Sequence, residues 1–153
     1  MRHYNAHRQH GLLYFPGAEV MKNETLLWEH KEGLAFLQGM EYKNGSLVCL
    51  KSGHYYIYSK VYLRSSNCRD MNEKNLSVVH TICRRTSQYP KELILLTNSI
   101  LYCNWKNSLW KQSSFLAGVV HLEKKDEVFI KVSQPQLVLR KDDTVSYFGT
   151  FMI

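Results

Sequence analysis

Residues 54–63 of this chain read HYYIYSKVYL, an alternation that fits an extended strand. Successive side chains of a β-strand point to opposite faces of its sheet. One face here carries three tyrosines and a lysine, Tyr56, Tyr58, Lys60 and Tyr62. The other face suits the core between two packed sheets, and it consists of Tyr55, Ile57, Ser59, Val61 and Leu63.

The tyrosine face is unusual for a chain that works alone. Three tyrosines side by side present more aromatic surface than a monomer normally exposes to water. Tyrosine combines a large apolar ring with a hydroxyl that can stay hydrogen-bonded, so it is frequent at subunit interfaces. Two interpretations remain open at this point, a subunit interface and a strand that the same chain buries on both faces.

Short apolar runs separated by turn residues continue on both sides of this strand. Asn44-Gly45 lies between two apolar segments, which is the strongest short signal for a β-hairpin. Further strands are predicted at residues 77–83, 93–96, 114–122, 128–132 and 146–153. The polar link at residues 124–127 is predicted to be a hairpin turn. Runs at spacings of about ten residues indicate an all-β sandwich or barrel.

The N-terminal region lacks this pattern. Residues 1–24 mix histidine, glycine, proline and scattered apolar groups, so we predict an extended arm with at most one edge strand near residues 11–15. The folded domain is predicted at residues 25–153. Residues 1–10 have no signal-peptide core, and no apolar run reaches the eighteen or so residues that span a bilayer. The targeting segment of an extracellular protein would therefore lie upstream.

The charge balance favours an acidic protein partner over nucleic acid. The 153 residues carry a formal net charge of +7, which attracts acidic surfaces. The twenty Lys and Arg residues are scattered, and the basic clusters are only pairs such as Arg84-Arg85 and Lys124-Lys125. A nucleic-acid-binding protein usually has a basic stripe or helix instead.

The four cysteines have long, irregular spacings without a Cys-x-x-Cys pair, so a zinc site is not expected. They could be buried thiols or a sparse set of disulfides in a secreted protein. The glycosylation sequons that begin at Asn23, Asn44 and Asn75 favour the secreted protein. Asn44 occupies a tight hairpin, so Asn75 and Asn23 are the predicted glycan sites.

No catalytic constellation is present in the sequence. Gly-x-Ser-x-Gly, His-Glu-x-x-His and phosphate-binding glycine loops are all absent. His3, His7 and His10 could in principle grip a metal ion, but they fall in the predicted arm, where no rigid element would orient them. We therefore expect a protein that is not an enzyme and that uses no cofactor or metal.

Three blocks of sequence resemble the tumour necrosis factor superfamily. They are GHYYIYSKV at residues 53–61, SFLAGVVHL at 114–122 and SYFGTFMI at 146–153, and the likeness covers residues 26–153. Within the family, residues 26–29, 33–37, 85–93 and 119–123 resemble the LIGHT branch, and the Fas ligand and TL1A branches share parts of the pattern. The N-terminus departs from the family, because a Pro-Ala-Ala-His-Leu type first strand is replaced by Asn5-Ala6-His7.

The resemblance implies a jelly-roll β-sandwich that forms a homotrimer. In the family, aromatic side chains line the threefold axis, and the matching positions here are Tyr58, Phe115 and Tyr147, with Tyr56 and Phe151 nearby. The implied function is that of an extracellular cytokine, the ectodomain of a type II membrane protein or its shed form, which clusters tumour necrosis factor receptors. A LIGHT-like member would bind herpesvirus entry mediator, lymphotoxin-β receptor and a decoy receptor. A C1q-like trimeric recognition domain is the alternative outside the family.

The resemblance also implies a disulfide and receptor contacts. Cys68 and Cys103 match a disulfide of LIGHT and Fas ligand, whereas Cys49 and Cys83 have no counterpart and could be free thiols or a second bridge. Receptors lie along grooves between subunits, and the main predicted anchor is Tyr89 in the loop at residues 84–90. The alternative for Tyr89 is a turn residue that caps the sandwich. For Trp105 and Trp110, the alternative to a receptor contact is packing against the disulfide. Further predicted contacts are Arg84, Arg85, Trp105, Lys106 and Trp110.

Overall fold

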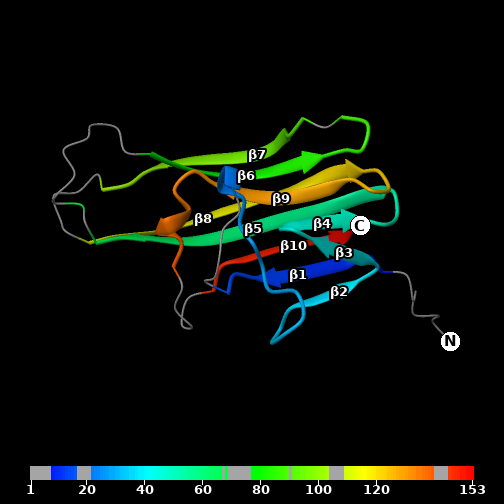
Figure 1. Cartoon of the computed structure of the whole chain (residues 1–153), viewed down its shortest axis with the longest axis horizontal. Coiled ribbons are helices and arrows are strands. Elements are labelled where there is room, and N and C mark those ends of the chain that lie inside the picture. Colours follow the sequence, from blue (N-terminus) through cyan, green and yellow to red (C-terminus); the bar gives the residue numbers. More distant parts are fainter. Residues whose placement is uncertain are drawn as a thin grey trace.

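The alternating pattern of residues 54–63 forms β5 (Gly53–Ser65), an inner strand next to the edge strand β8 (Trp110–Leu122) in a jelly-roll sandwich of two antiparallel sheets (Figure 1). The computed structural model describes residues 8–16, 22–66, 68, 77–89, 91–103, 109–139 and 145–153. The front sheet has the order β2 (Phe36–Gln38), β1 (His10–Tyr14), β10 (Tyr147–Met152), β5 (Gly53–Ser65) and β8 (Trp110–Leu122). The back sheet has the order β3 (Met40–Lys43), β4 (Ser46–Cys49), β9 (Glu127–Val132), β6 (Ser77–Arg85) and β7 (Leu93–Leu101). Among the described residues, the short 3-10 helices η1 (Lys22–Glu24) and η3 (Pro135–Leu137) lie in the connections.

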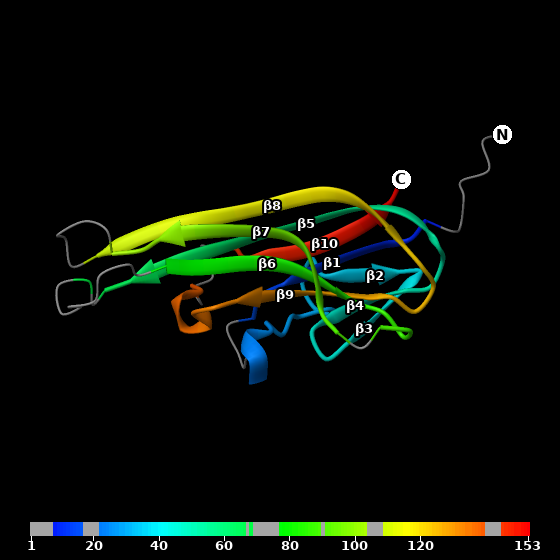
Figure 2. The ribbon, with the colours of Figure 1, turned by 90° about the horizontal axis from the view of Figure 1, so that it is seen from above.

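Strands β5 and β8 form the longest ladder of the molecule. Each has 13 residues, and they pair in unbroken register from Gly53 opposite Leu122 to Ser65 opposite Trp110. Figure 2 shows these two strands running beside β6 and β7 to one end of the sandwich. The predicted inner face of β5 is confirmed, because Tyr55, Ile57, Ser59 and Val61 are each 0% exposed.

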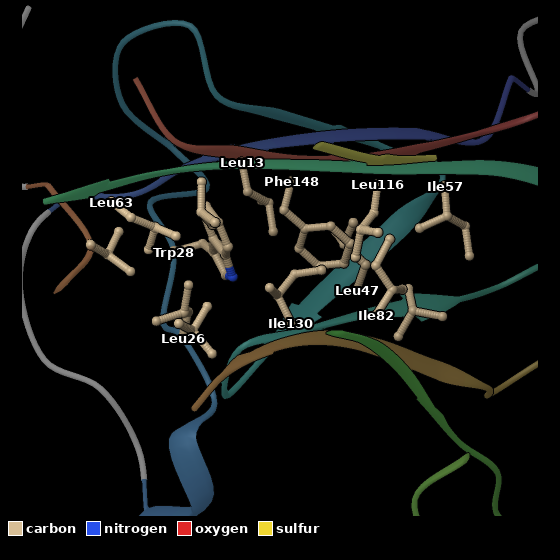
Figure 3. Close-up of a cluster of buried hydrophobic side chains, with 14 of the residues drawn as sticks. Leu13, Leu26, Trp28, Leu47, Ile57, Leu63, Ile82, Leu116, Ile130 and Phe148 are labelled. Atoms are coloured by element: carbon tan, nitrogen blue, oxygen red, sulfur yellow. The ribbon is translucent and has the colours of Figure 1, made fainter. Parts of the chain in front are cut away.

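The core lies between the two sheets. Figure 3 shows Leu13, Ile57, Leu116 and Phe148 of the front sheet facing side chains of the back sheet. Burial of each such side chain contributes about 1.5–3 kcal/mol. Their partners and the residues that close one side of the layer are Leu47, Ile82, Ile130, Leu26 and Trp28.

The two predicted turns have different outcomes. Asn44 and Gly45 join β3 to β4 with φ values of 48° and 93°, the left-handed conformation that this hairpin requires, so this prediction is confirmed. The turn at residues 124–127 is also tight, but β8 and β9 belong to opposite sheets, so the predicted hairpin is wrong. This turn forms a corner, which is held by the Glu123 N–H donating to Asp126 Oδ2 at 2.9 Å.

The N-terminal strand is the main departure from the predicted organisation. β1 pairs with β10 on one side and with β2 on the other, so it is an inner strand of the front sheet and not the edge strand of an arm. Its Leu13 is 0% exposed in the core. The five-residue strand was hard to recognise because its short apolar alternation is interrupted by His10 and Gly11.

Strands β7 and β8 are longer than the apolar runs that predicted them. β7 continues to Leu101 because it stays paired with β6, and β8 begins at Trp110 because it pairs with β5 as far as Ser65. The Thr97 hydroxyl lies 3.3 Å from that of Thr81, and Asn98 Nδ2 donates to Ser114 Oγ at 3.0 Å. Hydroxyl and amide pairs of this kind satisfy groups that would otherwise end a strand at the core.

The cysteines divide into one disulfide and two thiols. Cys68 and Cys103 form a disulfide, the pairing that the family resemblance implies. Cys49 on β4 and Cys83 on β6 are buried and free, so the alternative of a second bridge is not realised. Burial raises the pKa of both thiols, that of Cys83 to about 11. Both side chains therefore stay neutral and behave as small apolar groups.

A buried histidine links the two sheets through hydroxyl groups. His80 on β6 is 1% exposed, and its Nε2 lies 3.0 Å from Ser59 Oγ of β5. Its Nδ1 lies 2.8 Å from Ser114 Oγ of β8, which also accepts the Asn98 hydrogen bond. Burial lowers the pKa of His80 to about 4, so the imidazole is neutral at physiological pH.

The free energy of unfolding of the domain should therefore decrease as the pH is lowered, and His80 should account for part of this decrease. The unfolded chain takes up a proton near the usual pKa of 6.5, whereas the folded chain does so only near 4. The neutral ring contributes fully above pH 6.5, and this contribution is lost as the pH falls towards 4, by about 3 kcal/mol. Urea unfolding of the wild type and His80→Gln from pH 7 to 4 measures it. Parallel pH dependences of the two proteins would contradict the assignment.

Candidate functional site

An aromatic surface covers the outer face of the front sheet. Strand alternation turns Tyr56 and Tyr58 of β5, Phe115 of β8, and Tyr147 and Phe151 of β10 away from the core. These five residues, which the resemblance assigns to a trimer interface, line a single concavity of about 460 Å³. We call this set, with its neighbours from β1, the aromatic surface. The β1 residues are His10, Leu12 and Tyr14.

The rings of the aromatic surface contact one another and remain partly open to solvent. The ring centroids of Tyr56 and Phe151 are 5.2 Å apart, and those of Tyr58 and Tyr147 are 6.0 Å apart. Phe115 is 51% exposed and Phe151 is 37% exposed. Edge and offset contacts at such distances fix the orientation of the rings. Within the part of the chain that the structure describes, this ordered apolar face is therefore left partly uncovered.

Two titratable groups of the aromatic surface, Tyr58 and His10, have pKa values that are shifted towards the neutral form. Burial, reinforced by neighbouring tyrosines, raises the pKa of Tyr58 to about 12. Burial, and then the charge of Arg8, lowers the pKa of His10. Neutral Tyr58 and His10 side chains lose less hydration free energy than charged ones would when another apolar surface covers them.

Gly149 makes room for Tyr58 at the centre of this surface. It lies directly opposite Tyr58 in the pairing of β10 with β5. A Cβ atom at Gly149 would meet the hydroxyl and the ring of Tyr58 and would lie 2.9 Å from the Gly11 carbonyl oxygen. The tyrosine ring therefore lies over bare backbone, where no other residue would fit.

Some residues of the aromatic surface were not predicted from the sequence. His10, Leu12 and Tyr14 were missed because β1 was taken as part of an arm. Val119 was also missed, although it is 55% exposed and shares the outer face of β8 with Phe115. The signal that could have found them is the same period of two that identified the tyrosines.

The loop between β6 and β7 presents the predicted receptor anchor. Tyr89 is 59% exposed, and its backbone N–H donates to Thr86 Oγ1 at 2.9 Å. This local turn fixes the backbone while the ring faces solvent. The loop lies at the end of the sandwich opposite the Cys68–Cys103 disulfide, because β7 runs its full length between them. Nine residues of strand correspond to about 30 Å.

Two predicted receptor contacts already have partners within the chain. Arg85 lies 3.4 Å from Glu92 and 3.9 Å from Glu127, and its guanidinium stacks over the Phe129 ring at 4.5 Å. Arg84 Nη1 donates to the His121 carbonyl oxygen at 3.0 Å. These contacts hold both arginine side chains against other segments of the same chain. A role of Arg84 or Arg85 in receptor binding stays a prediction.

Trp110 is not a surface contact. It is 2% exposed, and its ring packs against Tyr102 with 5.8 Å between centroids. Trp110 and Cys68 both belong to the hydrophobic core, so Trp110 is a buried side chain and not the exposed contact that the sequence predicted. The sequence misled because Trp110 follows a polar segment, although it begins β8 on the inward face.

The remaining predicted sites have limited structural context. Trp105, Lys106 and Asn75 lie outside the described residues. Asn23 is exposed in η1, and its glycosylation stays a prediction. Among the described residues, no group of three or more His, Cys, Asp and Glu side chains is placed to hold a metal ion. The helices in the same ranges are all too short or too polar to cross a membrane.

Comparison with known proteins gives a consistent family. Residues 26–153 match the family described as "TNF(Tumour Necrosis Factor) family". The chain is 31% identical over 141 residues to human tumor necrosis factor ligand superfamily member 6, covering 92% of this chain and 48% of that protein. The pig protein of the same name is 35% identical over 141 residues, with the same coverage. Mouse tumor necrosis factor ligand superfamily member 15 is 36% identical over 146 residues, covering 89% of this chain and 58% of that protein. The chain thus spans about half the length of these relatives.

Substitution of Gly149 by alanine should disturb the aromatic surface. The added methyl group displaces Tyr58, and such overpacking costs about 1–3 kcal/mol of folding free energy. Gly53→Ala is the matched control, since its Cβ would meet only the flexible end of Met152 at 3.0 Å. Denaturant unfolding and near-ultraviolet circular dichroism of the tyrosines report the two effects. Equal behaviour of the two variants would show that Gly149 does not position Tyr58.

Proposed function

Because the chain belongs to the tumour necrosis factor family, we propose that it is the receptor-binding domain of an extracellular cytokine that acts as a homotrimer. In this proposal the domain carries no catalytic function and signals by gathering receptor chains. Linking three receptor sites in one particle raises the effective concentration of each site for the next receptor.

The aromatic surface is the observation that carries the proposal. It holds mutually oriented aromatic rings on an open face of one sheet. Tyr58, Phe115 and Tyr147 are proposed to lie nearest the threefold axis, with Tyr56 and Phe151 beside them. Covering one such side chain contributes about 1.5–3 kcal/mol. Three copies of the surface would give an assembly that does not dissociate at ordinary concentrations.

Receptors are proposed to bind along the grooves between neighbouring subunits. Tyr89 is the proposed anchor, because an exposed aromatic ring on a fixed turn loses little entropy on binding. The formal charge of +7 favours a receptor with an acidic surface. Trp105 and Lys106, which follow Cys103 in the sequence, are proposed as further contacts.

Two kinds of sequence similarity suggest two sets of candidate receptors. The residues that resemble LIGHT favour herpesvirus entry mediator, lymphotoxin-β receptor and a decoy receptor as partners. The identity to member 6, Fas ligand, and to member 15, TL1A, favours the receptors of those proteins as a second candidate set. We also propose that the chain is the ectodomain of a type II membrane protein or its shed form.

The trimer should be visible in solution mass. Light scattering of the unreduced domain is expected to give three times the 18.0 kDa of one chain. Tyr58→Asp and Tyr147→Asp should yield monomer or aggregate, because each would bury three carboxylates near the proposed axis. Tyr89→Asp places the same charge outside the aromatic surface and should leave the mass unchanged. A monomeric wild type, or a normal trimer of Tyr58→Asp, would refute the proposed interface.

Receptor binding should depend on Tyr89. Removal of an anchor ring costs 2 kcal/mol or more, which corresponds to roughly a 30-fold loss of affinity. Gln88→Ala, an exposed neighbour in the same loop, should bind with wild-type affinity. Surface plasmon resonance against a panel of both receptor sets measures this loss and identifies the partner. A receptor that binds Tyr89→Ala as tightly as wild type would mean that Tyr89 only shapes the turn.

A further inference from the structure

Two histidines face each other at one end of the front sheet. His54 of β5 and His121 of β8 are direct partners in the ladder, one pair in from its end at Gly53 and Leu122. Their rings meet edge to face, with 4.9 Å between centroids and 77° between planes. Both residues are exposed, and they share the outer face with Tyr56. Neither takes part in the core or in the aromatic concavity.

A fixed carboxylate orients one of the two imidazoles. Glu123 Oε1 lies 3.5 Å from His121 Nδ1, and Glu123 Oε2 accepts a hydrogen bond from Ser52 Oγ at 3.0 Å. Ser52 Oγ in turn accepts the backbone N–H of Lys124 at 3.0 Å. The chain of contacts directs Nδ1 of His121 to the carboxylate and leaves Nε2 free. A carboxylate behind an imidazole is the arrangement that orients histidine ligands in metal sites.

We propose that His54 and His121 form a two-histidine site for a divalent transition-metal ion, with Glu123 as the positioning residue. Imidazole nitrogen is a good ligand for copper(II), nickel(II) and zinc. Metal–nitrogen bonds of about 2.0–2.1 Å require the two nitrogens to converge on one point. Facing residues of neighbouring strands have Cβ atoms about 4.5–5.5 Å apart, so rotation of the two exposed rings brings their nitrogens together.

The charges around the pair set the character of the site. Glu123 offsets the positive charge of an ion, whereas Lys124 and Arg84, which reaches the His121 carbonyl, oppose it. Water would fill the remaining coordination positions, because the described residues offer no third ligand. The order of affinity should follow the usual series for nitrogen sites, with copper(II) above nickel(II) and zinc. His54 lies four residues from Tyr58 along β5, about 13 Å, and neither histidine lines the aromatic concavity.

Metal titration of the untagged, chelator-treated protein tests the site. Isothermal titration with copper(II), nickel(II) and zinc salts should give one ion per chain. His54→Gln and His121→Gln should each weaken binding at least tenfold. Glu123→Gln should weaken it about tenfold while one ion per chain still binds. His30→Gln should bind as wild type, because His30 stacks on Tyr42 away from the pair.

Electron paramagnetic resonance of the copper(II)-loaded protein gives the second readout. Coupling to two imidazole nitrogens is expected in the wild type and to one in His121→Gln. The sequence also has His3, His7 and His10, so the triple variant with glutamine at these positions separates the N-terminal histidines from the pair. Binding that survives His54→Gln/His121→Gln, or that disappears in the N-terminal triple variant, would overturn the proposal. The solution mass after chelation is measured in parallel, so that a failure of the trimer is distinguished from a failure of the metal site.

Discussion

The register between β5 and β8 is the constraint on which the rest of the structure depends. Thirteen pairs run without a bulge from Gly53 opposite Leu122 to Ser65 opposite Trp110. A shift of one residue in either strand would exchange every inward side chain for an outward one. The core, the aromatic surface and the His54–His121 pair all follow from this single alignment. The inner and outer faces of the front sheet are therefore specified together.

Each face of β5 carries one side chain that needs a particular partner from another strand. On the inner face, Ser59 is 0% exposed in an otherwise apolar row, and His80 of the opposite sheet satisfies its hydroxyl. On the outer face, Tyr58 needs a neighbour without a side chain, and Gly149 of β10 supplies one. A polar group in the core and an apolar ring on the surface are thus each matched by one residue from another strand. The Ser59–His80 contact and the Tyr58–Gly149 contact therefore restrict which strands can lie next to β5 or opposite it.

Much of the fold could be predicted because a strand with one buried face has apolar residues at every second position of its sequence. The alternation in β5 and the Asn44-Gly45 turn depend only on local residues, and both were predicted correctly. The position of β1 between β10 and β2 depends on partners far away in the sequence, so its five residues looked like an edge. The turn after β8 has hairpin-like residues, but the change of sheet is decided by packing of the whole sandwich.

The candidate site was predictable to the extent that it lies on regular strands. Tyr56, Tyr58, Phe115, Tyr147 and Phe151 gather on one concavity, whereas the residues assigned to loops do not share such a pattern. Trp110 illustrates the limit, because the direction of a side chain at the start of a strand depends on where pairing begins. Arg84 and Arg85 illustrate a second limit, because their partners come from distant segments of the chain. These partners are His121, Glu92 and Glu127.

The position of β8 at the edge of the front sheet has a consequence for the single chain. Its 13 residues have a hydrogen-bonded neighbour on one side only, and they carry Phe115 and Val119 in exposed positions. A long edge with apolar side chains is a template onto which any extended peptide can add. An unassembled copy is therefore at risk of aggregation during synthesis, and a subunit contact over this edge in the proposed trimer would protect it. In the proposed trimer, assembly would therefore affect the yield of folded protein as well as receptor binding.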